Sequence, residues 1–163
     1  MRIAAKTALV ALAIDQISKI AVVHGLDLKD RVTIDVIPPY LNFRMAWNQG
    51  VNFGLLANNV DLMRWVLIAV ALAIAVWVWR WVGHEGHSDA AKVAAGLLIG
   101  GALGNVIDRV IYGAVADFLN MSCCGFDNPF SFNLADVAVF LGAVGLVLLT
   151  GRQNTRDGPG SMR

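Results

Sequence analysis

Charged residues are scarce in this chain of 163 residues, where Asp, Glu, Lys and Arg make up only 15%. A typical soluble domain has about 25%. Hydrophobic residues reach 57%, and the mean hydropathy is +0.61. Neither sign of charge dominates, because 13 basic and 12 acidic residues leave a net charge of +1. Nucleic-acid binding needs a clustered basic face, so it is disfavoured. The composition indicates one small domain in a lipid bilayer.

Cysteine, proline and histidine are also rare, with 2, 4 and 3 copies. Cys123 and Cys124 are adjacent, which is not the spacing of a metal site and permits only a strained bridge. His84 and His87 lack the cysteine or acidic partners of a zinc site. Phosphate-loop, dinucleotide and Gly-Xaa-Ser-Xaa-Gly motifs are absent from the sequence. We therefore expect neither a metal nor an organic cofactor.

Apolar segments of membrane-spanning length are abundant instead. The clearest covers 62–82, whose Trp residues and two Arg residues lie near its ends, while 4–23, 90–112 and 133–150 are interrupted by polar residues. Basic residues are concentrated on the side of the two termini, which predicts cytoplasmic termini. We predict an α-helical integral membrane protein with four transmembrane helices in a single domain, residues 1–150.

The segments outside these spans differ in character. Within the connection 25–61, residues 32–37 and 41–47 favour β-structure, and Pro38-Pro39 between them rules out a continuous helix. This predicts a small β-rich cradle on the extracytoplasmic side, between the first and second helices. The polar segment 151–163, with Gly and Pro, is expected to be a disordered cytoplasmic tail.

The first apolar segment has a second interpretation. Arg2 and Lys6 followed by the apolar run 8–14 resemble a cleavable secretory signal. Apolar residues resume at 20–23 after a polar patch, and a retained helix keeps the charge pattern consistent. We therefore favour a membrane span that remains in the protein.

Polar residues inside membrane spans are energetically expensive and indicate function. In the predicted topology they lie in the outer halves of their helices, where one pocket would collect them. They are Asp15, Lys19, Asn105, Asp108, Arg109, Asn133 and Asp136. Asp15 and Lys19 share a helix face and are expected to form a structural ion pair. Gly96, Gly100 and Gly104 recur every four residues, which predicts close helix packing.

Asp117 and Asp136 form the predicted reactive pair. Asp117 follows the third span directly, and Asp136 lies in the first turn of the fourth, where the helix dipole favours a carboxylate. Two close carboxylates in a low-dielectric site share one proton, so one can activate water while the other polarises a carbonyl. The spacing alone is equally consistent with a helix-start acid and an unrelated loop residue.

Several motifs in order resemble the bacterial lipoprotein signal peptidases (signal peptidase II). They are DQISK at 15–19, NQGVNFG at 48–54, GNVIDR at 104–109, VADF at 115–118 and FNLAD at 132–136. The resemblance covers about residues 10–145. It implies an aspartic endopeptidase of the bacterial inner membrane that acts near the outer face without a cofactor, and nothing in the sequence requires more than a monomer. The implied substrates are prolipoproteins, cut before a diacylglyceryl-modified cysteine, and membrane lipids are the implied surroundings.

The resemblance also implies roles for individual residues. Asp117 and Asp136 become the catalytic pair, and Asp15, Lys19 and Asp108 become structural supports. The residues implied to bind substrate or to support the pair are Asn48, Gly50, Asn105, Arg109 and Asn133. Asn52 departs from the pattern, since the family commonly has a small residue before Phe53.

Two other classes of function remain to be weighed. A proton-coupled transporter could use intramembrane acids as a relay, but it needs polar residues through the whole bilayer depth. The inner halves of the second and third spans are almost entirely apolar. A non-enzymatic assembly partner would use the glycine face and leaves Asp117 and Asp136 unexplained.

Overall fold

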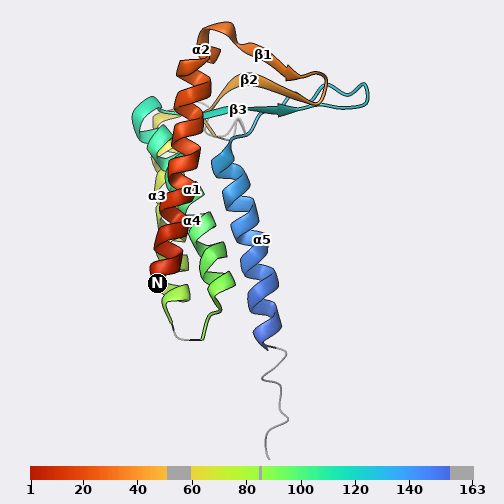
Figure 1. Ribbon diagram of the computed structural model, residues 1–163. Helices are drawn as coiled ribbons and strands as arrows, with labels where there is room; N and C mark the ends of the chain where they lie inside the picture. The colour runs from red at the N-terminus through yellow and green to blue at the C-terminus, as the bar shows by residue number, and fades with distance from the viewer. Residues whose placement is uncertain (51–59, 85, 155–163) are drawn as a thin grey trace, which may run out of the picture.

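The computed structural model describes residues 1–50, 60–84 and 86–154. Long helices form a bundle, and a small sheet lies across one end of it (Figure 1). The elements in chain order are α1 (Arg2–Lys19), the π-helix η1 (Ile20–Gly25), α2 (Leu28–Arg31), β1 (Thr33–Ile37), β2 (Leu41–Asn48), α3 (Val60–Gly83), α4 (Asp89–Tyr112), β3 (Val115–Met121) and α5 (Leu134–Asn154).

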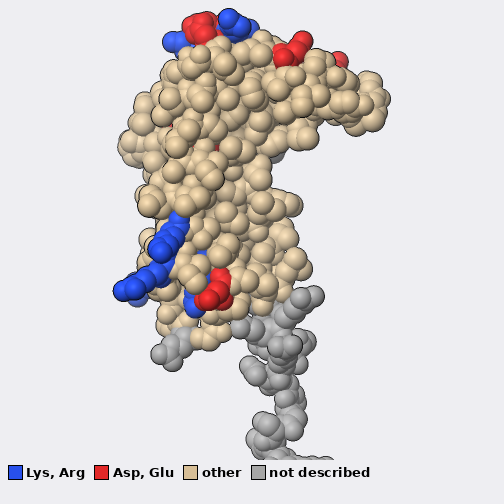
Figure 2. Space-filling view, in the orientation of Figure 1, with Lys and Arg blue, Asp and Glu red and all other residues tan. Residues whose placement is uncertain are grey.

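Three helical segments in the described residues are long and apolar enough to cross a membrane. They are Arg2–Gly25, Asp61–Gly83 and Asp89–Tyr112. The apolar part of α5, Leu134–Leu149, is shorter, so a fourth span stays a prediction. On the face shown in Figure 2, charged side chains gather toward the two ends of the molecule and leave an uncharged band between them. This distribution is typical of a membrane protein.

The helix α4 is the centre of the bundle, because small residues let its neighbours approach closely. A Cβ atom at Gly96 or Gly100 would collide with the backbone of α1, at the carbonyl oxygens of Ala4 and Ala8. A Cβ atom at Gly101 would collide with the carbonyl oxygen of Ala135 at the start of α5. The predicted close packing of the glycine stripe is therefore confirmed, and its partner is α1.

The first helix is an integral part of this bundle. It packs along α4, and the carboxylate of Asp15 accepts a hydrogen bond from the backbone N–H of Ala135 at 2.9 Å. Beyond it, Val22 of η1 joins Leu28 and Phe118 in a buried apolar cluster beneath the sheet. These contacts support the retained helix over the cleavable signal.

The sheet has the order β1-β2-β3, with antiparallel pairing throughout. The β1–β2 hairpin confirms the predicted β-structure in the 25–61 connection. The third strand corrects the expected composition of the cradle, because β3 comes from the segment after α4. Its first residues are buried on both faces, so the sequence lacks the alternation of a half-buried strand. A bulge in β2 between Phe43 and Ala46 shifts the β2–β3 register next to Asp117, which pairs with Ala46.

The last helix is longer than predicted. The helix α5 ends at Asn154, which is within the segment expected to be a disordered tail from residue 151. The remainder of that segment and Asn52 lie outside the described residues.

Candidate active site

Asp117 and Asp136, the predicted reactive pair, are joined through one buried asparagine. The side-chain amide of Asn133 donates to Asp117 Oδ1 at 2.6 Å. Its backbone N–H donates to Asp136 Oδ2 at 3.2 Å, and its Oδ1 accepts from the backbone N–H of Asp136 at 2.9 Å. The last two bonds form a reciprocal cap at the start of α5. The cap orients Asn133 and Asp136 together, which holds the two acids near one another.

Two further asparagines complete the contacts of this aspartate pair. Asn48, the last residue of β2, donates from Nδ2 to Asp117 Oδ2 at 3.1 Å. Asn105 of α4 donates to Asp136 Oδ1 at 2.8 Å and accepts from Asn133 at 3.2 Å. The structure therefore brings three of the predicted supporting residues into direct contact with the pair.

Gly50 does not contact the aspartate pair directly but is hydrogen-bonded to Asn48. Its backbone N–H donates to Asn48 Oδ1 at 3.0 Å, which fixes the amide that faces Asp117. Gly50 has φ +100°, a conformation that side chains rarely adopt, and a Cβ atom there would meet Leu67 of α3. The positive φ favours glycine at this position, whereas the Leu67 side chain could move to make room.

Arg109 has few partners within the protein. Its Nη1 donates to the backbone oxygen of Asn105 at 3.3 Å, and its buried Nε has no hydrogen-bond partner among the described residues. Asp108, the preceding residue, points the other way and bonds to the backbone N–H of Ala116. The two neighbours thus differ in direction as predicted, and Arg109 keeps a donor available for a ligand.

An open apolar groove of about 390 Å³ leads to this arginine. Its walls come from α3, α4 and α5, and Arg109 and Asn105 are its polar members. The apolar lining consists of Leu67, Val70, Ala71, Ile74, Leu98, Ala102 and Val139. Such a groove suits an extended apolar chain whose polar end reaches the asparagines.

Asp117 lies on β3, outside the long helices, and its environment favours the protonated form. Burial and, to a smaller extent, the negative charge of Asp136 raise the pKa of Asp117, which is about 6 after all influences are combined. Hydrogen bonds from Asn48 and Asn133 act in the opposite direction. The pair is therefore suited to hold one shared proton near neutral pH.

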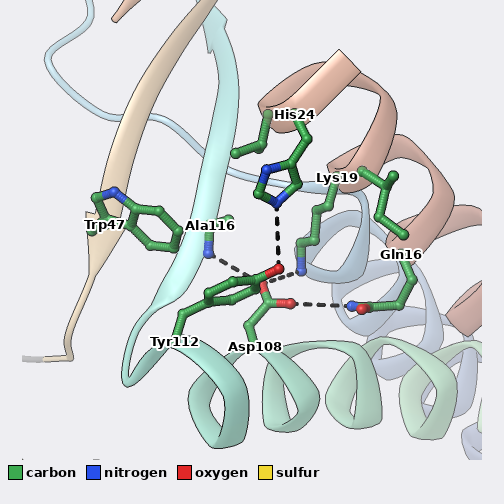
Figure 3. Close-up of a pocket in the computed structure, with 9 residues that line it drawn as sticks. Gln16, Lys19, His24, Trp47, Asp108, Tyr112 and Ala116 are labelled. Atoms are coloured by element: carbon green, nitrogen blue, oxygen red, sulfur yellow. Dashed lines mark hydrogen bonds and ion pairs between the residues drawn. The ribbon is translucent and has the colours of Figure 1, made fainter. Parts of the chain in front are cut away.

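A cluster of buried charges lies beside the pair, between α1 and α4 (Figure 3). Lys19 Nζ is 2.9 Å from Asp15 Oδ2 and 2.8 Å from Asp108 Oδ2. The predicted Asp15–Lys19 ion pair is confirmed, with Asp108 as a third member. Gln16, which contacts both acids at 3.1 Å, was missed. A polar side chain next to Asp15 in an otherwise apolar span was the signal for it.

Among the described residues, no group of three or more His, Cys, Asp or Glu side chains could hold a metal ion. Cys123 and Cys124 are both exposed and unbridged. The chemistry available at the aspartate pair is that of carboxylates, amides and a guanidinium.

Comparison with known proteins supports one family. The family model described as "Signal peptidase (SPase) II" matches residues 7–151. A lipoprotein signal peptidase of Methylorubrum extorquens (strain PA1) is 42% identical over 86% of this chain and 80% of its own. One from Methylobacterium sp. (strain 4-46) is 36% identical over 88% and 86%.

Solved structures of membrane enzymes have a similar fold. Two structures of bacterial membrane enzymes match with TM-scores of 0.75 and 0.73, at 25% and 27% sequence identity. The first match covers 98% of this chain and 94% of that one; the second covers 89% and 90%. The family model and the sequence relatives show that the chain belongs to the signal peptidase II family.

Proposed function

We propose that this protein is an aspartic endopeptidase that removes the signal peptide from prolipoproteins, cutting before a diacylglyceryl-modified cysteine. The observation that carries the catalytic type is the convergence of Asp117 and Asp136 on Asn133. The family and the names of its relatives support the substrate class.

The geometry supports hydrolysis by an activated water. The ionised member of the pair takes a proton from water, which attacks the scissile carbonyl, while the protonated member donates a hydrogen bond to the carbonyl oxygen. The tetrahedral intermediate then collapses, and the leaving amine takes the proton that came from water. Asn105 and Asn133 orient the two carboxylates, and Arg109, whose side chain lines the groove, is placed to hold a substrate carbonyl. The reaction requires neither a metal nor an organic cofactor.

The proposed membrane arrangement has four spans, with α5 as the fourth. Its 21 residues extend about 30 Å at 1.5 Å per residue. The basic bias places both termini in the cytoplasm of a bacterium, so the sheet and the aspartate pair lie at the outer face of the inner membrane. A monomer contains every residue that the proposal uses. The substrate reaches it through the bilayer, with its acyl chains in lipid.

A transporter is not supported. The family is one of peptidases, and the groove is lined by apolar residues except at the end formed by Asn105 and Arg109. A proton relay needs polar groups across the whole bilayer.

The substrate is tested with synthetic precursor peptides that differ only in the diacylglyceryl group. We expect the purified protein to cleave the modified peptide, with kcat/KM at least about a hundredfold above that of the unmodified one, because remote binding energy supports the reacting geometry. Both peptides are assayed in the same micelles, and their partitioning is measured as a control. Equal rates for the two peptides would contradict the proposed substrate.

The pH dependence follows from the shared proton. Because the pKa of Asp117 is about 6, the proton leaves as the pH rises through that value. We expect kcat/KM, measured between about pH 5 and about pH 8, to fall on the alkaline side with an apparent pKa near 6. The hydrogen bond from Asn48 lowers the pKa of Asp117, so Asn48→Ala should move this limb to higher pH. A flat profile in both proteins would exclude the shared proton.

A further inference from the structure

The buried charges between α1 and α4 are not explained by stability. Asp15 and Asp108 are each 1% exposed, and Lys19 is 5% exposed. Removing three charges from water is costly, and buried ion pairs add little net stability for that reason. No hydrogen bond joins Asp15 or Asp108 to Asp117 or Asp136 within the part of the chain that the structure describes. Asp15 and Asp108 instead accept hydrogen bonds from backbone groups next to the aspartate pair.

Each buried carboxylate holds the peptide group that comes just before a member of the pair. Asp15 Oδ1 accepts from the backbone N–H of Ala135 at 2.9 Å, and Ala135 precedes Asp136. Asp108 Oδ2 accepts from the backbone N–H of Ala116 at 3.1 Å, and Ala116 precedes Asp117. The start of α5 and the start of β3 are thus each fixed by a carboxylate one residue away from the acid they carry.

Lys19 links the two carboxylates. Its ammonium group lies 2.9 Å from Asp15 Oδ2 and 2.8 Å from Asp108 Oδ2. Gln16, one turn earlier on α1, makes a second link, because its Nε2 lies 3.1 Å from an oxygen of each acid. Figure 3 shows the Asp108 end, where Gln16, Lys19 and Ala116 all converge on that side chain. A continuous chain of contacts therefore runs from Ala135 through Lys19 to Ala116.

We propose that Lys19 is a positioning residue that sets the separation of Asp117 and Asp136, by joining the two carboxylates that hold Ala116 and Ala135. This inference rests on the proposed function, because the separation matters only if the pair is catalytic. Lys19 also donates to Asn105 Oδ1 at 3.3 Å, and Asn105 bonds to Asp136. The ammonium group of Lys19 therefore also helps to hold Asp136 in place, through Asn105.

The competing explanation is that Lys19 only neutralises two buried acids. Neutralisation alone predicts a loss of folded protein, and a shift of the alkaline limb through the lost charge, without a lower kcat on the acidic side of that limb. Positioning predicts that folded molecules have a lower kcat, since a displacement of about 1 Å at reacting groups costs about a hundredfold. The alkaline limb should move to higher pH under either explanation, because the positive charge of Lys19 lowers the pKa of Asp117, so kcat of the folded molecules on the acidic side of that limb is the deciding measurement.

The test uses the full-length protein in detergent with the lipid-modified precursor, and rates are divided by the folded fraction. We expect Lys19→Met to lower kcat by about tenfold to about a hundredfold, to leave KM within about threefold, and to move the alkaline limb. The matched control is Lys92→Met, which removes a lysine from an ion pair with Asp89 at the opposite end of α4. The control should have the same kcat, KM and alkaline limb as the parent protein.

A second pair of variants keeps the test decisive if Lys19→Met does not fold. Asp108→Asn retains an oxygen that can accept from Ala116, whereas Asp108→Leu does not. Positioning predicts that kcat is at least about tenfold higher for Asp108→Asn than for Asp108→Leu. Equal kcat values in this pair, or a parental kcat in folded Lys19→Met, would overturn the inference. Asp117→Asn is the reference variant. If Asp117→Asn still cleaves the precursor, the proposed function itself fails. If Asp117→Asn is inactive while Lys19→Met is fully active, only the positioning role is refuted.

Discussion

Asp117→Asn is expected to reduce cleavage of the lipid-modified precursor by at least about a thousandfold, equivalent to about 4 kcal/mol of transition-state stabilisation. Asparagine has nearly the same shape and keeps one acceptor oxygen, which can serve Asn48 or Asn133 but not both, so the fold should survive with one hydrogen bond lost. It cannot gain or lose a proton, however, and the pair then has no acid–base cycle. Asp136→Asn should have an equal effect for the same reason.

The measurement is single-turnover cleavage, together with binding of the precursor to each variant. Binding should persist, because the groove between α3, α4 and α5 is unchanged. Asp35→Asn is the matched control, since Asp35 is exposed on β1 of the same sheet. Substantial cleavage by both Asp117→Asn and Asp136→Asn would exclude the aspartic mechanism.

The second large effect is expected at the contact between α1 and α4. A Cβ atom at Gly100 would collide with the carbonyl oxygen of Ala8 and lie 2.9 Å from the Cβ atom of Ala11. Gly100→Val should therefore force the two helices apart and lower the free energy of unfolding by at least about 3 kcal/mol. Thermal unfolding in detergent measures this as a lower Tm.

Gly83→Val is the control for that experiment. Gly83 is also helical, but a Cβ atom there would meet only Met1, at 3.6 Å or more, which is an ordinary contact. Its Tm should stay close to that of the parent protein. Equal losses at the two positions would mean that helix propensity, rather than the close contact, controls stability.

The helices and the β1–β2 hairpin could be predicted because their signals are local. Long apolar runs gave the positions of α1, α3 and α4 to within a few residues, and the Pro38-Pro39 turn separated β1 from β2. The strand β3 was missed because Val115, Ala116 and Phe118 are all buried, so no alternation distinguishes the strand from a loop. Its place in the sheet depends on pairing with β2, which lies far away in the sequence.

The site was predictable as a set of residue types but not as a set of contacts. Asp15, Lys19 and Asp108 stood out because charges are rare in membrane spans. That Asp15 bonds to Ala135 and Asp108 to Ala116 could not be read from the sequence, because backbone N–H groups carry no residue-specific signal. Gln16 was overlooked for a related reason, since its role depends on two acids that are distant in sequence from one another.

The late position of α5 in the chain has a consequence for biosynthesis. Asn133 and Asp136 lie at its start, and the backbone of Ala135 must meet Asp15 from the first helix. A nascent chain that has inserted only α1, α3 and α4 holds a single carboxylate of the pair and lacks the amide of Asn133 that bonds to it. Under the proposed mechanism, proteolytic competence begins only when the last helix leaves the ribosome and enters the bilayer, so the order of translation itself keeps the unfinished enzyme inert.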